Sequence, residues 1–174
     1  MGCSTGAVQR CKGTSRFSGN HAFSINPLGV NMEKRALTTE QRELLRATFG
    51  YTDEQIDRIE ADPKRREIID HGPELNGTKM IAECVDAENC SFNKVGDRYV
   101  FSGQGYLLKD ESCEKPCLWA MHSFLPFSYL LYDRVASGLD PNEMHVTQIQ
   151  CEDVGHRHGG FGKATFKIRF EKCG

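Results

Sequence analysis

The stretch Lys163-Ala164-Thr165-Phe166-Lys167-Ile168-Arg169-Phe170 decides the fold, because it alternates apolar and polar side chains along its whole length. In an extended chain successive side chains point to opposite faces. The apolar members therefore share one face and the polar members share the other. This pattern predicts a half-buried β-strand, which needs neighbouring strands to pair with and an apolar layer to cover it.

Other segments of residues 73–174 supply these partners. Runs rich in β-branched and aromatic residues predict strands over 78–85, 95–102 and 144–150. The apolar run 114–134 predicts a helix, with an interruption near Pro126, because proline lacks an N–H and crowds the preceding turn. The fold class expected is therefore α+β, with a small antiparallel sheet packed against a helix.

Residues 33–72 predict a short helical segment in front of this body. Thr38 with Gln41, and Thr52 with Gln55, have the spacing of capping boxes, and Gly50 separates the two helices. The segment carries eight basic and ten acidic residues, which argues against reading DNA. We interpret it as a small helical lid or oligomerisation element.

Residues 1–32 predict an extended arm. They are rich in Gly, Ser and Asn, and their charge is +3 from Arg10, Lys12 and Arg16 with no acidic residue. Such a composition cannot bury enough apolar surface to fold alone. We expect the arm to contact a neighbouring subunit of a homo-oligomer or a larger protein complex; a mobile tail is the alternative.

The composition narrows the function classes. A net charge of −2 over 174 residues predicts no nucleic-acid partner and no anionic membrane partner. The N-terminus has no apolar region of the kind that a secretory signal needs, so we expect a cytoplasmic protein. In a reducing compartment, its eight cysteines are expected to be free thiols or metal ligands rather than disulfides.

Cys117 is the first candidate for chemistry. It follows Pro116 at the expected start of a helix, where the backbone dipole and free N–H groups favour a thiolate. Cys113 lies four residues earlier and would share a face with Cys117 if both were helical. The alternative is a buried core thiol beside Trp119, since cysteine is among the most buried residue types.

A second candidate region follows the expected strand 144–150. Cys151 comes directly after that strand, and Asp153, His156 and His158 follow it in a glycine-rich loop. His156 and His158 are two residues apart, so in an extended chain they would point to the same side. Combined with thiolates, they would complete a tetrahedral nitrogen and sulfur set suited to zinc. An exposed hairpin tip is the alternative.

A metal-independent enzyme is another hypothesis. Cys117 would be the nucleophile or acid–base group, with His122, Asp153 or His156 beside it, acting on a small-molecule substrate. His122 lies five residues after Cys117, an offset that does not share a helix face. The chain contains no Walker loop, dinucleotide fingerprint or His-Glu-x-x-His motif.

Three short motifs resemble a family of small, functionally uncharacterised prokaryotic proteins with dispersed cysteines. They are Val95-Gly96-Asp97, Cys117-Leu118-Trp119-Ala120, and Cys151-Glu152-Asp153 followed by residues 166–168. The resemblance covers roughly residues 79–170. It implies a small α+β body in which Cys90, Cys117 and Cys151 recur, and it implies no particular reaction.

These observations favour a metal-binding small subunit or accessory protein. The expected ligands are Cys90, Cys117 and Cys151 with either His156 or His158, and the expected metal is zinc. Zinc is favoured over an iron–sulfur cluster, because the cysteines are not closely spaced as in ferredoxin motifs. With only three protein ligands the fourth position would be open and possibly catalytic. The alternatives are a metal-independent enzyme that uses Cys117 as a reactive thiol and a purely structural subunit.

Overall fold

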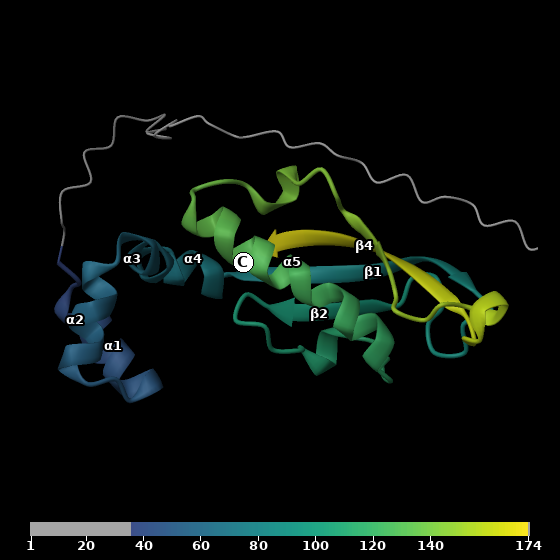
Figure 1. Ribbon diagram of the computed structural model, residues 1–174, viewed down its shortest axis with the longest axis horizontal. Helices are drawn as coiled ribbons and strands as arrows, with labels where there is room; N and C mark the ends of the chain where they lie inside the picture. The colour runs from purple at the N-terminus through teal and green to yellow at the C-terminus, as the bar shows by residue number, and fades with distance from the viewer. Residues whose placement is uncertain (1–35, 174) are drawn as a thin grey trace, which may run out of the picture. The chain divides into compact units, whose positions relative to one another are not determined.

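The computed structural model describes residues 36–173, and the expected arm, residues 1–32, lies outside this range. The described chain is an α+β protein, as predicted (Figure 1). Its helices are α1 (Thr39–Phe49), α2 (Asp53–Ala61), α3 (Pro63–Asp70), α4 (Gly72–Asn76) and α5 (Leu118–Ala136). Its strands are β1 (Thr78–Glu88), β2 (Arg98–Ser102), β3 (Gln148–Gln150) and β4 (Lys163–Lys172). Short 3-10 turns are η1 (Lys109–Glu111), η2 (Pro141–Glu143) and η3 (His156–His158).

The strands form one four-stranded antiparallel sheet in the order β2-β1-β4-β3. The strand predicted from the alternating stretch is β4, and it lies in the middle of the sheet between β1 and β3. Its register pairs Met80 with Phe170 and Ala82 with Ile168, which aligns the apolar face of β4 with that of β1. The period-two pattern therefore sets the register, because a slip by one residue would turn the apolar side chains to the polar face.

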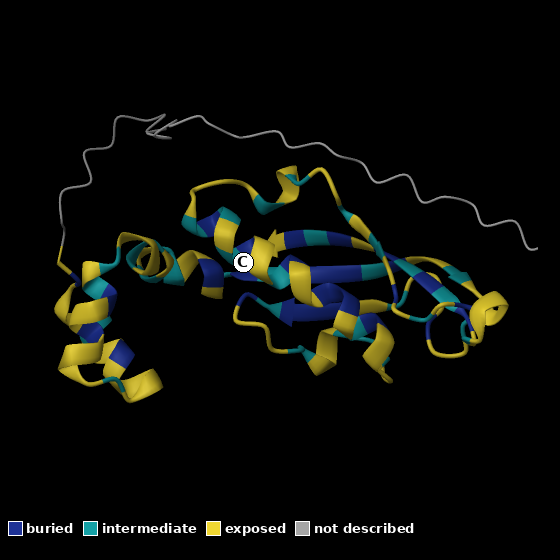
Figure 2. Cartoon of the chain, viewed as in Figure 1, coloured by how far each residue is buried: buried dark blue, intermediate teal, exposed yellow. Residues whose placement is uncertain are grey.

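Helix α5 lies across one face of this sheet and closes the main core (Figure 1). Phe124 and Phe127 of α5 are buried together with Tyr99 of β2 and Phe166 of β4. The rings of Phe124 and Phe166 meet edge-on, with centroids 4.9 Å apart. Figure 2 colours the chain by burial and shows buried residues along β1, β2 and β4. This core holds fixed the strand ends from which the cysteine-bearing loops depart.

Two local predictions were wrong. The second strand begins at Arg98 rather than at residue 95, because Gly96 adopts φ +93° and Asp97 closes a turn by accepting from the N–H of Lys94 at 2.8 Å. Helix α5 also runs through Pro126 without a break. Phe124 and Phe127 anchor the helix to the sheet on both sides of the proline, so the missing N–H does not end it.

The helical segment carries the predicted caps. Both capping boxes are present, and Asp62 caps α3 with Pro63 at its first position. A separate small core of Leu37, Leu45 and Ile56 stabilises this segment. The expected boundary between residues 72 and 73 falls inside α4, so the segment joins the body through a helical turn. Among the described residues, no helix combines the length and the apolarity that crossing a bilayer requires.

Candidate functional site

Cys90, Cys117 and Cys151 line one small cavity at the end of the sheet where α5 begins. They come from three different segments: the loop after β1, the residue that precedes α5, and the residue that follows β3. The cavity has a volume of about 10 Å³. This is close to the roughly 10–15 Å³ that one water molecule needs, so the space suits one water or one ion and no organic molecule.

The loop that carries Cys90 is held by a close backbone contact. Asn89 turns the chain in the left-handed region at φ 52°, directly after β1. Gly162 lies against this turn so closely that a Cβ atom there would be 2.4 Å from the Asn89 carbonyl oxygen. Glycine is therefore required at position 162, and this contact fixes the Cys90 loop against the start of β4.

A buried tyrosine joins two of the three thiol-bearing segments. Tyr99 of β2 is fully buried, and its hydroxyl donates to Oδ1 of Asn93 and accepts from the N–H of Cys117 at 3.0 Å. Burial raises the pKa of Tyr99, which keeps the hydroxyl protonated and able to donate. Asn93 in turn contacts Cys90. The network therefore couples the Cys90 loop to the residue before α5.

The hydrogen bonds of the sulfur atoms separate the cysteines into two kinds. Cys90 Sγ accepts from the backbone N–H of Asn93 at 3.3 Å and from its side-chain amide at 3.6 Å. Cys151 Sγ accepts from the N–H of Ala164 at 3.3 Å. These N–H groups hold the two sulfur atoms in position. Cys84 differs, because its thiol donates to the carbonyl of Asp86 at 3.4 Å.

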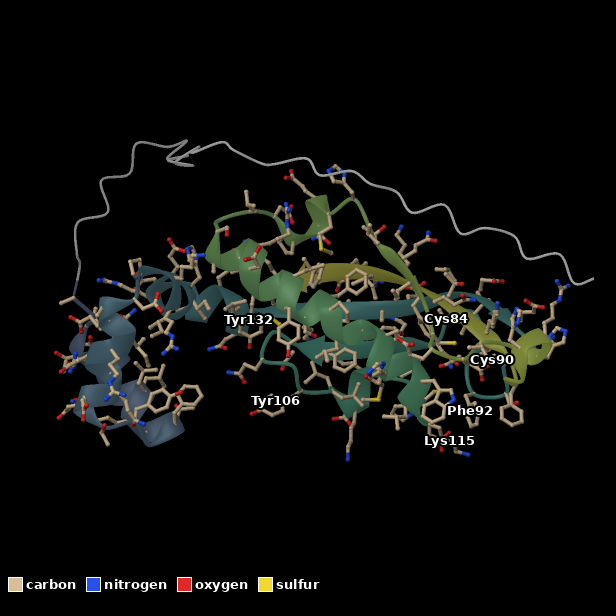
Figure 3. All side chains as sticks on the ribbon, in the orientation of Figure 1. Cys84, Cys90, Phe92, Tyr106, Lys115 and Tyr132 are labelled. Carbon is tan, nitrogen blue, oxygen red and sulfur yellow. The ribbon has the colours of Figure 1, made fainter. Side chains whose placement is uncertain are left out.

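Cys84 and Cys113 are the thiols whose pKa values rise. Cys84 is fully buried in the core, and burial raises the pKa of its thiol to about 11. Burial also raises the pKa of Cys113. Cys113 lies before α5 and not on it, so the shared helix face expected for Cys113 and Cys117 does not form. Figure 3 marks Cys84 and Cys90 at the same end of the body, with Phe92 below them in this view.

The histidines do not join the thiols. His156 and His158 form the short 3-10 turn η3, so the extended geometry expected to align them is absent. His156 lines a different cavity, and neither imidazole lines the one between the thiols. His122 is exposed on α5 and pairs with Glu152 at 3.4 Å. The structure thus leaves the three thiols without the expected imidazole.

Asp153 lines the thiol cavity but closes its own loop. One carboxylate oxygen accepts from the N–H of Gly155 at 2.8 Å and from that of Phe161 at 3.1 Å. Gly160 packs on the same carboxylate, since a Cβ there would be 2.0 Å from it. Asp153 therefore holds the loop from residue 153 to 161 in shape, a structural role that differs from the expected acid–base role.

Exposed aromatic side chains surround the thiols. Phe92, Trp119 and Phe161 all line the cavity, yet they are 65%, 50% and 79% exposed. Within residues 36–173, no three His, Cys, Asp or Glu side chains are disposed as ligands around one point. The thiols therefore share a cavity without forming a closed ligand set.

Asn93 and Tyr99 belong to this site although no pattern in the sequence indicated them. Asn93 lies three residues after Cys90, a spacing that has no established meaning for an amide. Tyr99 belongs to a strand whose pattern indicates only burial. A buried hydroxyl needs a partner, which is the one general signal that could have drawn attention to Tyr99.

The fold and the site together define an α+β protein with a thiol-lined cavity beneath exposed aromatic side chains. No family model, no curated protein and no solved structure matches the chain. The resemblance to small cysteine-containing proteins therefore stays a prediction, based on the short motifs alone.

Proposed function

We propose that the chain is a metal-binding small subunit or accessory protein, and that Cys90, Cys117 and Cys151 bind one zinc ion. The observation that carries the proposal is the shared cavity of these three thiols, with room for a single small occupant. A metal–thiolate site needs sulfur donors from rigid segments and N–H groups that orient them. The hydrogen bonds to Cys90 and Cys151 supply the second requirement.

Binding requires the thiols to move inward. Zinc–sulfur bonds of about 2.3 Å place tetrahedral ligands about 3.8 Å from one another. The side chain of Cys117 can turn toward this point, because it makes no capping hydrogen bond at the start of α5. With His156 and His158 outside the cavity, the fourth position would be filled by solvent or by a ligand from a partner.

An organic substrate of Cys117 has less support. The cavity is too small for one, and His122 pairs with Glu152 on the exposed side of α5 instead of serving as a base for Cys117. A cytoplasmic location belongs to the proposal, because a reducing compartment keeps the thiols free to bind metal.

Elemental analysis of the purified full chain tests the proposal. We expect about one zinc per chain in the wild type and loss of that zinc in Cys117→Ser and Cys151→Ser. Two control variants probe thiols outside the cavity: Cys173→Ser removes an exposed thiol and Cys84→Ala removes a core thiol. Both controls should retain zinc. A chain that binds no zinc when it is refolded with the metal would disprove the proposal, as would equal zinc loss in the Cys173→Ser control.

A further inference from the structure

A second and larger cavity lies where η3 meets the end of β1 and the start of β4. Its volume is about 160 Å³, and it shares only Gly162 with the thiol cavity. The space is many times what one water needs, so it can hold a small organic molecule. Its charged or polar lining residues are Glu88 at the end of β1, His156 and Arg157 in η3, and Lys163 at the start of β4; the first three are exposed at the rim and Lys163 is half-buried.

The charged side chains around this cavity are not paired with one another or with other described residues. Among residues 36–173, Glu88, Arg157 and Lys163 form no ion pair, although thirteen other pairs are present. Their sum is +1, from two cations and one carboxylate, with His156 neutral. A cavity with an excess cation attracts an anion, and the Glu88 carboxylate can accept a hydrogen bond from the same molecule.

Glycine contacts hold the walls of the cavity in place. Gly155 adopts φ +75°, and a Cβ there would be 2.6 Å from Cε of Lys163. The methylene chain of Lys163 therefore lies directly on the Gly155 backbone, which limits the rotation of its ammonium group. Asp153 fixes Gly155 through its hydrogen bond of 2.8 Å. A site with walls ordered in advance loses less conformational entropy when a ligand binds.

We propose that this cavity binds a small monocarboxylate that also carries a hydroxyl group, such as a hydroxy acid. Arg157 offers the planar pair of donors that matches a carboxylate, and Lys163 adds a second cation. Glu88 accepts from the hydroxyl group of the ligand. A monoanion balances the charge of +1, whereas a phosphate dianion would leave excess negative charge beside Glu88. The proposal depends on none of the thiols, so it stands or falls separately from the zinc site.

Calorimetric titration of the full chain with lactate, acetate and inorganic phosphate tests the inference. We expect lactate to bind most tightly, because acetate has no donor for Glu88 and phosphate carries the wrong charge. Arg157→Gln and Lys163→Gln should each weaken lactate binding about tenfold or more, as expected for loss of a charge-assisted hydrogen bond. Lys167→Gln is the matched control, since Lys167 is exposed on the same strand and lies outside the cavity.

Two further variants separate the roles of the lining residues. Arg157→Lys retains the charge and loses the paired donors, so it should weaken lactate binding more than Lys167→Gln does. Glu88→Gln should reduce the preference for lactate over acetate. The inference is overturned if none of the three probes saturates the chain, if phosphate binds as tightly as lactate, or if Lys167→Gln weakens binding as much as the cavity variants.

Discussion

Tyr99→Phe is expected to destabilise the protein although it keeps the aromatic ring in the core. The hydroxyl satisfies Oδ1 of Asn93, which is 4% exposed, and the N–H of Cys117. A buried polar group that loses its partner costs about 1–3 kcal/mol. Cys117 is half-buried, so the loss of the hydrogen bond to its N–H should cost about 1 kcal/mol, the lower end of this range. The sum is a loss of about 2–4 kcal/mol in the free energy of unfolding.

Urea unfolding followed by circular dichroism measures this loss. The midpoint should fall at an unchanged slope, because the surface exposed on unfolding stays the same. Thermal unfolding should shift down by about 6–12 °C for a chain of this size. Tyr106→Phe is the matched control, since Tyr106 is 68% exposed, and it should change the free energy of unfolding by less than about 0.5 kcal/mol. Equal effects of the two substitutions would refute the role assigned to the Tyr99 hydroxyl.

Three other perturbations have defined outcomes. The free energy of unfolding should fall as pH rises from 9 to 11, because the Cys84 thiol ionises near 9.0 in the unfolded chain and near 11 in the folded one. This difference in pKa corresponds to a loss of roughly 2–3 kcal/mol. Urea titration at each pH measures the loss, and Cys84→Ala should flatten the profile. Gly162→Ala should lower the free energy of unfolding by about 2–3 kcal/mol, because the added Cβ meets the Asn89 backbone. Gly159→Ala, at φ +89° in open space, should lower it by about 1 kcal/mol. Similar losses in chemical denaturation would contradict the close contact at Gly162. Deletion of residues 1–31 should leave the melting temperature nearly unchanged, because the arm has little apolar surface to bury, and should weaken assembly as measured by light scattering. Unchanged assembly would contradict the proposed role of the arm.

The fold could be predicted from sequence wherever a short-range pattern decides it. The alternation in β4 and the capping boxes at Thr38 and Thr52 are local signals, and the structure confirms them. The prediction of a break at Pro126 was wrong because the packing of Phe124 and Phe127 is a long-range effect. The helix-breaking effect of proline is overcome here, because large side chains are buried on both sides of Pro126 and stabilise the helix.

The site could be predicted only in part, for a related reason. The three cysteines were identified one by one from their positions at the ends of expected elements, and the cavity that they share depends on the strand order β2-β1-β4-β3. The histidine prediction assumed an extended chain from 156 to 158. Gly155 at φ +75° and Gly159 at φ +89° instead let the chain turn into η3. Glycines on both sides of a histidine pair are a sign that the pair lies in a turn.

The direction of the hydrogen bonds at sulfur bears on the choice between a structural and a metal-binding role. Cys84 in the core donates to the carbonyl of Asp86, and burial raises the pKa of its thiol. Cys90 and Cys151 instead accept from N–H groups. A purely structural subunit gives no reason for two acceptor sulfurs to line the same cavity as Cys117. The proposed zinc ion would supply such a reason, because it needs sulfur ligands that hydrogen bonds hold in position.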